Sequence, residues 1–510
     1  MPIKLYSAAV VGLDAQPIEV EVDIDYRCHP GFVIVGLPDK AVSEAKDRVI
    51  AAFRNTVSPS PYKKITVNLA PADLRKAGPG FDLPIAVGLL AMFGEVQLDR
   101  WTKSIFIGEL ALDGSVHATA GVLPMAMMAK HRGFKYLFVP EINAAEAALV
   151  DGVVVYGVKT LKQLQGHLNG QTALKPWPKS KISDESGCLA GADFADIRGQ
   201  QQAKRALEIT AAGAHNILMS GPPGSGKTML ARALPSILPP LDVTESLEVT
   251  KIHSIAGLVR TDSPLISTRP FRTPHHTASG VALVGGGTWP RPGEISLAHR
   301  GVLFLDEFPE FPRTVLEALR QPLEDQVITI SRAQGTLSFP AQFILVAAQN
   351  PCQCGFAGDP ERECVCTPLQ IANYQKRLSG PLLDRIDLHL VVPRVKVAEL
   401  TDGAGSSNRA ESSAVIRKRV LAARRIQADR FAESRMKSNS EMGPREIKQF
   451  CALDSPSLTL LQKAVSQLHL SARNYFRILK VARTIADLGG AEKITLEHVG
   501  EALQYRGQQV

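Results

Sequence analysis

The feature that most restricts how this chain can fold is the octapeptide Gly-Pro-Pro-Gly-Ser-Gly-Lys-Thr at positions 221–228. An apolar segment at 217–219 precedes it, and a helix-forming segment at 229–234 follows it. A glycine-rich loop between a strand and a helix lets backbone N–H groups and the positive end of the helix dipole face phosphates. The pattern therefore predicts an ATP-binding loop made of Gly221, Pro222, Pro223, Gly224, Ser225, Gly226, Lys227 and Thr228.

The loop and a second strand end together predict the parts of a hydrolytic site. We expect Lys227 to reach the β- and γ-phosphates and Thr228 to ligate Mg²⁺. A buried apolar strand is expected at 301–305, and it ends in two carboxylates, Asp306 and Glu307. Asp306 would hold Mg²⁺, and Glu307 would polarise the attacking water.

A third apolar segment, 343–348, is followed two residues later by Asn350, which can position the water beside the γ-phosphate. The alternative is an ordinary strand-end asparagine that favours a turn. Arg385 and Arg473 suit bidentate contact with a γ-phosphate, and Arg473 lies at a helix start with Ser471 as a plausible N-cap. Each arginine could instead form an ion pair, since Arg385 has aspartates one residue before it and two after it. The residues alone leave both alternatives open.

The length of 510 residues exceeds what one hydrophobic core supports, so two to four domains are expected. We assign residues 1–168 to an α/β domain, 169–192 to a linker, and 193–398 to the nucleotide-binding core. Residues 399–510 contain the connector 401–412 and then helical patterns only. The predicted fold class is α/β, with a helical C-terminal lid.

Hydrophobic periodicity places elements in the first domain. Residues 17–24 alternate apolar and acidic side chains, as a half-buried strand does. Further strands are expected at 65–69, 105–112 and 135–139, and helices from Gly36 to about Phe53 and from Pro84 to Phe93.

Composition excludes some classes of protein. The formal net charge of +8 and pI of about 9.0 are compatible with a polyanionic partner without demonstrating one. The sequence contains no apolar run of 18 residues and no signal-peptide core, so we expect no membrane span and a cytoplasmic location. The crowding of four of the seven cysteines into 352–366 argues against a secreted disulfide scaffold.

The clustered cysteines form two Cys-x-Cys pairs separated by a nine-residue loop. Four thiolates suit a closed tetrahedral zinc site with a structural role, and such a site would stiffen the loop after Asn350. Free thiols or redox pairs are the alternatives. We interpret His275-His276 as part of a loop or hairpin rather than a second metal site, because adjacent side chains diverge. The candidate zinc ligands are Cys352, Cys354, Cys364 and Cys366.

The nucleotide-site residues together resemble the AAA+ ATPases, and more narrowly their magnesium-chelatase-like branch. The closest likeness lies in Phe-Arg-Thr-Pro-His-His-Thr-Ala-Ser at 271–279 and Arg-Pro-Gly-Glu-Ile-Ser-Leu-Ala-His at 291–299. The resemblance implies an inserted hairpin before Asp306 and a second hairpin around 331–333, which grip DNA in the pore of related rings. It also implies that Arg385 is an arginine finger and Arg473 a second sensor.

The N-terminal domain resembles the Lon-type proteases at 76–86 and 108–116. Those proteases use a serine and a lysine, but Gly80 and Leu123 stand at the corresponding positions here. Without a hydroxyl and an amine there is neither nucleophile nor base, so we expect a Lon-like fold without proteolysis. We interpret nearby Lys76 as a surface charge or a DNA contact.

This combination of domains is similar to the ComM/YifB family. The resemblance implies a hexameric, ATP- and Mg²⁺-dependent DNA helicase that drives branch migration during natural transformation. It implies single-stranded, forked or branched DNA and recombination proteins as partners. We select Arg272, Arg291 and Arg332 as candidate contacts to DNA phosphates, with surface arginines or intersubunit pairs as alternatives. Alternative functions are a motor for metal chelation or protein remodelling, and an ATP-dependent protease.

Overall fold

The structure is a computed structural model, in which the chain divides into two compact units. Unit 1 comprises Met1–Glu185, Asp242–Ile266 and Gly287–Pro292, and unit 2 comprises Ser186–Leu241, Ser267–Gly286 and Gly293–Val510. Unit 1 therefore gathers two segments that interrupt the nucleotide-binding core in sequence. The structure describes residues 2–26, 29–56, 63–76, 78–179, 192–287, 291–332, 335–395, 411–434, 436–468 and 470–506.

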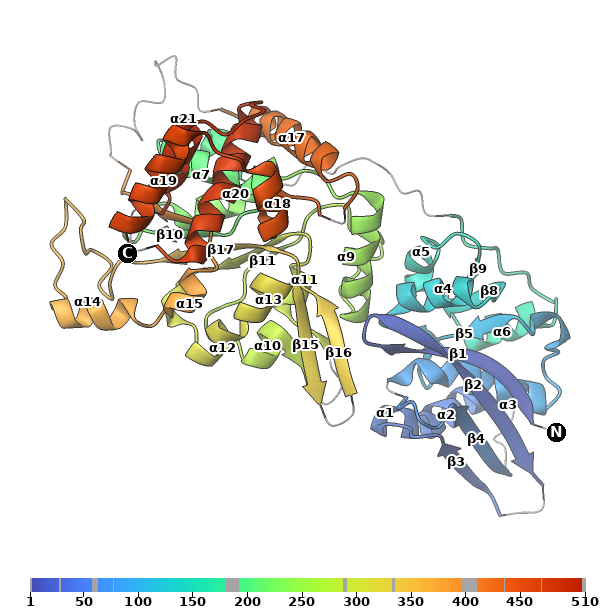
Figure 1. The fold of residues 1–510 in the computed structure, drawn as a ribbon. Helices are drawn as coiled ribbons and strands as arrows, with labels where there is room; N and C mark the ends of the chain where they lie inside the picture. The colour runs from blue at the N-terminus through green and yellow to red at the C-terminus, as the bar shows by residue number, and fades with distance from the viewer. Residues whose placement is uncertain are drawn as a thin grey trace. The chain divides into compact units, whose positions relative to one another are not determined.

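Unit 1 is built on a seven-stranded mixed sheet (Figure 1). Across the sheet the strands are β3 (Gly31–Val35), β4 (Lys64–Ala70), β2 (Asp14–Asp25), β1 (Ile3–Val11), β5 (Ser104–Phe106), β8 (Tyr136–Pro140) and β9 (Val154–Val158). β2 runs antiparallel to both of its neighbours, and the other adjacent pairs are parallel. In β2, Ile18, Val20 and Val22 are fully buried, whereas Glu19 and Glu21 are ion-paired with Lys4. This alternation confirms the half-buried strand expected at 17–24.

Helices cover both faces of this sheet. Successive side chains of a strand point to opposite faces, and in this sheet they enter two separate hydrophobic clusters, one on each side. The helices of unit 1 are α1 (Lys40–Ser43), α2 (Ala45–Thr56), α3 (Asp82–Met92), α4 (Val122–His131), α5 (Glu141–Ala147), α6 (Leu161–Leu168) and α9 (Val243–Ile255). Two expected boundaries were wrong. The single helix expected from Gly36 is two helices that begin only at Lys40, after Leu37 adopts a positive φ of 56°. The strand expected at 105–112 breaks at Gly108, where a Cβ would lie 2.7 Å from Val116 Cγ1.

Unit 2 contains an all-parallel five-stranded sheet. Its strands, in spatial order, are β11 (Phe271–Arg272), β14 (Val302–Leu305), β17 (Ile344–Gln349), β10 (Ile217–Ser220) and β18 (Leu388–Val391). β14, β17 and β10 are buried along their whole length, as expected for parallel strands covered on both faces. Because these three strands are adjacent and parallel, the segments that follow them meet at one edge of the sheet.

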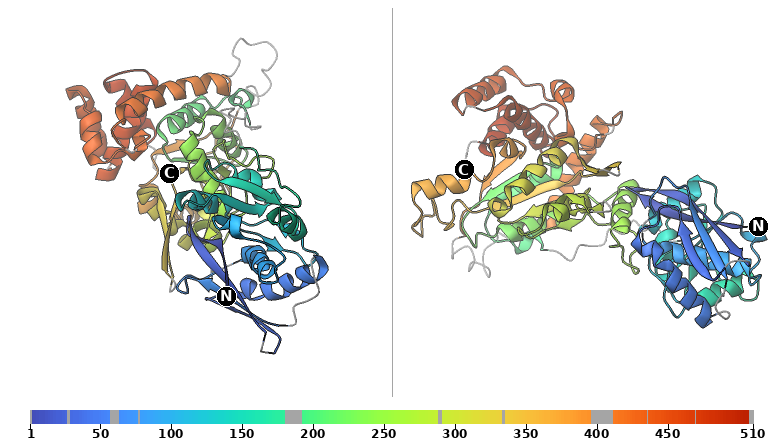
Figure 2. Two further views of the ribbon diagram at one scale, coloured as in Figure 1. Left: turned by 90° about the vertical axis from the view of Figure 1, so that its right-hand side faces the viewer. Right: turned by 90° about the horizontal axis from the view of Figure 1, so that it is seen from below.

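Unit 2 also contains several helices and a hairpin that projects away from this sheet (Figures 1 and 2). The hairpin consists of β15 (Val327–Arg332) and β16 (Gly335–Pro340), which are paired over their full length, from Val327–Pro340 to Arg332–Gly335. The helices of this part of unit 2 are α7 (Gln201–Gly213), α8 (Lys227–Ile237), α10 (Gly280–Val284), α11 (Glu294–Leu297), α12 (Arg313–Ala318), α13 (Arg320–Asp325), α14 (Pro368–Gln375) and α15 (Gly380–Leu383).

The C-terminal part of unit 2 is helical, as expected, and packs on α7 and α8. Its helices are α17 (Ser413–Arg430), α18 (Pro444–Phe450), α19 (Ser455–Gln467), α20 (Ala472–Leu488) and α21 (Leu496–Gln504). Ser471 caps α20 by accepting a hydrogen bond from Asn474 N at 3.3 Å, which confirms the expected N-cap. The connector 401–412 lies largely outside the described residues, and so does the part of the linker 169–192 that runs from residue 180 to residue 191.

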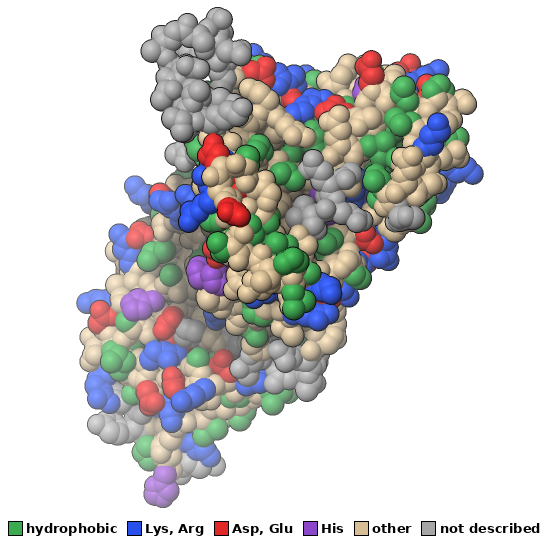
Figure 3. Space-filling view, turned by 90° about the vertical axis from the view of Figure 1, so that its left-hand side faces the viewer, with side chains coloured by type: hydrophobic (Ala, Val, Ile, Leu, Met, Phe, Trp, Pro, Cys, Tyr) green, Lys and Arg blue, Asp and Glu red, His purple; other side chains and the backbone are tan. Residues whose placement is uncertain are grey.

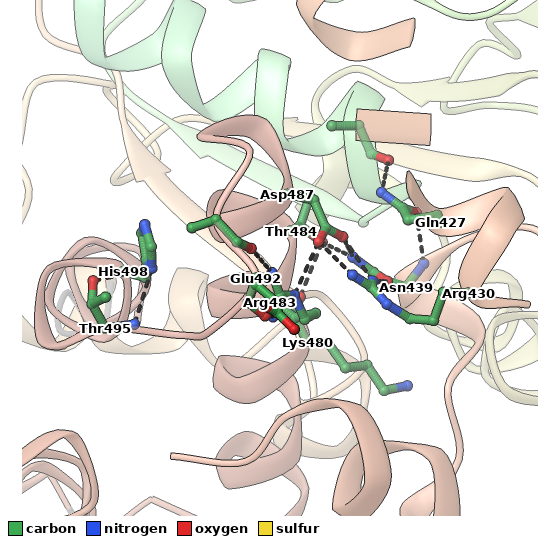
Figure 4. A network of polar contacts seen from close by, with 12 residues as sticks. Gln427, Arg430, Asn439, Lys480, Arg483, Thr484, Asp487, Glu492, Thr495 and His498 are labelled. Atoms are coloured by element: carbon green, nitrogen blue, oxygen red, sulfur yellow. Dashed lines mark hydrogen bonds and ion pairs between the residues drawn. The ribbon is translucent and has the colours of Figure 1, made fainter. Parts of the chain in front are cut away.

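A buried polar network ties these helices together (Figure 4). The carboxylate of Asp487 on α20 accepts hydrogen bonds from Arg430 at 2.6 Å, Asn439 at 2.8 Å and Arg483 at 3.0 Å. Asp487 and Arg483 are each at most 3% exposed. Since buried charges are tolerated only when paired, the network fixes α17 against α20.

The described surface carries both signs of charge. On the face shown in Figure 3, Lys and Arg side chains lie among acidic and hydrophobic ones, without a single continuous basic patch in the part that the structure describes. Among the described residues, no helix is both long and apolar enough to cross a membrane.

Candidate nucleotide site

The phosphate loop connects β10 to α8 at the carboxyl edge of the unit 2 sheet. Gly224 and Gly226 have φ of +77° and +87°, the left-handed region that glycine adopts without strain. Gly221 is needed for a different reason, because a Cβ there would lie 2.2 Å from the Val392 carbonyl oxygen. α8 begins at Lys227, so its N-terminal N–H groups lie at the end of the loop, as a phosphate site requires.

The Lys227 ammonium is turned into its own loop. Its Nζ donates to the carbonyl oxygens of Gly221 at 2.7 Å and Pro222 at 2.9 Å, and lies 3.4 Å from Asn350 Oδ1. Burial lowers the pKa of Lys227 to about 8, while the nearby Asp306 carboxylate acts in the opposite direction. The side chain therefore lies within reach of both the loop and the strand end that carries Asn350.

Thr228 and Asp306 face each other across the edge of the sheet. Thr228 Oγ1 donates to Asp306 Oδ2 at 2.9 Å, although 78 residues separate them in the chain. A hydroxyl and a carboxylate are hard oxygen donors of the kind Mg²⁺ prefers, so the pair fits the ion expected there. The structure thus brings together Lys227, Thr228, Asp306 and Asn350 as the sequence predicted.

Glu307 has a partner that sequence reasoning missed. Its Oε2 lies 2.9 Å from Nδ1 of His276, and its backbone has a positive φ of 52°. The Glu307 side chain is 54% exposed, so a water molecule can reach it. We expected His276 only in a loop or hairpin, and no sequence rule connects a histidine to a carboxylate 31 positions away.

The two predicted phosphate-sensing arginines share one carboxylate, that of Glu324 on α13. Arg385 Nη2 lies 2.5 Å from Glu324 Oε2, and Arg473 Nη2 lies 3.5 Å from Glu324 Oε1. Arg385 is 7% exposed and also donates to the Pro381 carbonyl oxygen at 2.6 Å. Arg385 is therefore ion-paired in this structure, with an acid distant in sequence.

The aspartates beside Arg385 have other partners. Asp384 Oδ1 accepts from Asn474 at 3.2 Å, and Asp387 is ion-paired with Arg477. Burial alone would raise the pKa of Asp387, but Arg477 and His215 hold it well below its usual range. Neither carboxylate is thus the neighbouring partner that the sequence suggested for Arg385.

The four clustered cysteines converge after β17. Cys352 Sγ lies 3.3 Å from Cys354 Sγ and 3.7 Å from Cys364 Sγ, and all four sulfur atoms lie within 4.8 Å of one another. Tetrahedral zinc with bonds of about 2.3 Å requires sulfur separations of about 3.8 Å, so the cluster fits a structural zinc ion. Cys366 completes the set.

The three arginines proposed for DNA lie in different settings. Arg272 on β11 forms a bidentate ion pair with Glu294, at 2.6 and 2.7 Å, within the same chain. Arg291 lies exposed in the short strand β13 (Arg291–Pro292). Arg332 is the last residue of β15, at the tip of the hairpin expected around 331–333, and its side chain lies outside what the structure describes.

One of our predictions for residues 76–86, the loop that resembles Lon-type proteases, was wrong. Lys76 is buried, and its Nζ donates to the Pro71 carbonyl oxygen, so its interpretation as a surface charge or DNA contact was wrong. Burial also lowers the pKa of Lys76. Gly80 lies beside Thr119, whose Cγ2 would be 3.3 Å from an added Cβ, and Leu123 is fully buried at the start of α4.

Comparison with known proteins agrees with this geometry. The family described as "Magnesium chelatase, subunit ChlI" matches residues 193–400, and its C-terminal family matches 410–506. A third family, "Subunit ChlI of Mg-chelatase", matches residues 20–143. The fold and the phosphate loop thus define a magnesium-chelatase-like AAA+ protein.

Relatives that align over the full length of the chain show which family of magnesium-chelatase-like proteins it belongs to. The chain is 46% identical to competence protein ComM of Haemophilus influenzae, with 98% of this chain and 97% of that protein aligned. It is 43% identical to the uncharacterized protein YifB of Escherichia coli, over 98% and 96% of the two chains. The magnesium-chelatase 38 kDa subunit of Cereibacter sphaeroides is 26% identical over only 31% of this chain and 52% of its own. The chain therefore belongs to the ComM/YifB family.

Proposed function

We propose that this protein is a ring-forming ATPase that moves along DNA and promotes branch migration when incoming strands are integrated during natural transformation. The observation that carries this proposal is the 46% identity to a competence protein over 98% of the chain. That similarity extends through the N-terminal domain, the nucleotide core and the helical C-terminal region, and therefore concerns the whole architecture.

Each residue of the nucleotide site has a proposed role in ATP binding or hydrolysis. The backbone N–H groups of 221–228 and the α8 N-terminus would bind the phosphates of ATP, with Lys227 on the terminal ones. Thr228 and Asp306 would hold Mg²⁺, which when bound neutralises phosphate charge. Glu307 would orient the attacking water and accept its proton, and Asn350 would fix the water's position.

Two arginines would complete the site by balancing negative charge on the transferred phosphoryl group. A guanidinium can bond two phosphate oxygens at once, which makes Arg385 and Arg473 suitable. In a homo-hexamer each could serve its own nucleotide or that of a neighbouring subunit. A structural zinc ion on the four cysteines would stiffen the loop that follows Asn350.

DNA would be engaged through its phosphates by the β15–β16 hairpin, with Arg332 near its tip, and by the exposed Arg291. Arg272 could contribute only by leaving Glu294, so we rank it third. Single-stranded, forked or branched DNA is the proposed substrate, and recombination proteins are proposed partners.

The test measures ATP hydrolysis and strand displacement on three- and four-way DNA junctions, with Lys227→Ala as the inactive control. We expect junction DNA to stimulate hydrolysis and strands to be displaced only with ATP. Hydrolysis without DNA stimulation or displacement would refute the DNA motor while leaving the ATPase intact.

A motor for metal chelation or protein remodelling is the second candidate. All three matched families are named for magnesium chelatase, which favours it. Against it, the chelatase subunit of Cereibacter sphaeroides aligns with only 31% of this chain. Stimulation of hydrolysis by a tetrapyrrole-enzyme partner instead of DNA would select this alternative.

A further inference from the structure

Glu324 occupies an unusual position in unit 2, because both of its carboxylate oxygens are directed to arginines predicted to sense phosphate. Oε2 lies 2.5 Å from Arg385 Nη2, and Oε1 lies 3.5 Å from Arg473 Nη2. The two arginines come from separate elements, one just after α15 and the other at the start of α20. A single carboxylate therefore joins three parts of the chain.

The Arg385 guanidinium depends on this carboxylate. Its side chain is only 9% exposed, and its Nε lacks a hydrogen-bond partner among the described residues. A buried guanidinium without a counter-charge is strongly unfavourable, and Asp384 and Asp387 already bond other groups. If Glu324 moves away, Arg385 needs another anion in its place.

The Glu324 end of the pair can exchange partners. Its side chain is 42% exposed, and that of Arg473 is 58% exposed, so water reaches both. The exposed pair between Glu324 and Arg473 is worth about 1 kcal/mol or less, and a multiply charged phosphate can replace Glu324 as the counter-charge of the buried Arg385. Glu324 and a nucleotide phosphate are thus alternative anions for the same two arginines.

Glu324 is also joined directly to the β15–β16 hairpin. Only Asp325 and Gln326 separate it from Val327, the first residue of β15. The Gln326 carbonyl oxygen accepts from Ala341 N at 2.7 Å, so the two strands close immediately beside the end of α13. Because the hairpin is fully paired, movement of its tip is transmitted to its base and so to Glu324.

We propose that Glu324 is a positioning residue that holds Arg385 and Arg473 away from nucleotide until the hairpin binds its ligand. This inference rests on the proposed function, with DNA as the ligand of the hairpin. Hairpin engagement shifts α13, Glu324 releases the arginines, and these then balance charge on the phosphoryl group. Coupling between the two sites acts in both directions, so nucleotide also changes the affinity of the hairpin for DNA.

The experiment compares full-length wild type with Glu324→Gln, which retains shape but removes the charge, and Glu324→Asp, which retains the charge. Asp325→Asn is the matched control, since the same chemical change falls on the exposed adjacent residue. Initial rates of ATP hydrolysis give kcat and KM, with and without a forked DNA of fixed sequence.

We expect Glu324→Gln to raise kcat without DNA by about fivefold or more, and to bring the ratio of DNA-stimulated to basal kcat close to one. Asp325→Asn should match wild type, and Glu324→Asp should restore most of the stimulation ratio. A purely structural pair would instead lower kcat by the same factor with and without DNA, and that result would overturn the proposal.

A double variant guards against misfolding and against failure of the proposed function. In the Arg385→Ala background, Glu324→Gln should no longer raise basal kcat, because the restrained group is gone. If wild type shows no DNA stimulation at all, the DNA function fails, but the rise in basal kcat still tests Glu324. Should Glu324→Gln not fold, Glu324→Ala takes its place, because it also removes the charge. A rise in basal kcat in that variant supports the proposal, and a basal kcat at or below the wild-type value contradicts it.

Discussion

Gly355, in the loop that carries the cysteines, packs directly on Pro223 of the phosphate loop. A Cβ at Gly355 would lie 2.6 Å from Pro223 Cδ, and Gly355 has a φ of +89°. The cysteine cluster therefore supports the nucleotide site through a contact that leaves no room for a side chain. Rigid support of this kind holds the loop in the shape that phosphate binding requires.

This contact predicts that Gly355→Ala weakens ATP binding. The new methyl group must displace Pro223 or shift the cysteine loop, in addition to the strain of a left-handed alanine. Gly358→Ala is the control, because Gly358 has a similar φ of +76° but nothing within 4 Å of an added Cβ. We expect at least a tenfold rise in Kd for a fluorescent ATP analogue in the first variant only, the equivalent of about 1.4 kcal/mol. Equal Kd values would contradict the contact.

The lowered pKa of Lys227 predicts that the protein takes up a proton when it binds nucleotide above pH 8. Its pKa of about 8 lies below the ordinary value of 10.5, so the amine is mostly neutral above pH 8 in the free protein. Bound phosphates favour the ammonium, and ATP affinity should fall by up to about tenfold per pH unit between pH 8 and 10. Calorimetry at pH 8.5 in two buffers of different ionisation enthalpy should register the uptake, and identical heats would refute it.

The same lowered pKa makes the free energy of unfolding rise with pH, whereas it makes ATP affinity fall. Between about pH 8 and 10.5 the unfolded chain holds a proton on Lys227 that the folded chain has lost. The contribution of Lys227 to the free energy of unfolding therefore rises with pH across this window. Methionine cannot titrate, so in Lys227→Met the free energy of unfolding should lose this part of its rise with pH. Denaturant titrations at pH 8, 9 and 10 measure the difference.

The cysteine cluster predicts bound zinc, at about one ion per chain. Replacing Cys354 or Cys366 by Ser removes one of four ligands and should lower the metal content measured by elemental analysis after dialysis. Cys451→Ala is the control, because Cys451 is buried far along the sequence, in the helical region. Zinc content unchanged in the first two variants would show that the thiols serve another purpose.

The Asp487 network predicts a large loss of local stability in Asp487→Asn. The change leaves Arg430 and Arg483 buried with a neutral partner, and breaking such pairs costs about 3–5 kcal/mol. Asp429→Asn is the matched control, since this exposed aspartate precedes Arg430 on α17. Hydrogen exchange of α17 and α20 amides in the full chain measures the difference, and equal protection would contradict the role of the network.

Sequence by itself determined the features that depend on local backbone chemistry. The phosphate loop, the buried strand before Asp306 and the N-cap at Ser471 follow from glycine placement, apolar runs and capping residues within a few positions. The parallel order of β14, β17 and β10 then brings Thr228 to Asp306 and Lys227 to Asn350. These pairings were predictable because strand ends in such a sheet meet at one edge.

Only the tertiary structure decided which charged groups pair across long stretches of chain. Glu324 with Arg385, and His276 with Glu307, join residues 61 and 31 positions apart, although Arg385 has two aspartates within two positions in the chain. Lys76 similarly looks like a surface residue in sequence, yet it is buried. Burial and the removal of water select one partner among many, and that selection depends on the packing of the whole chain.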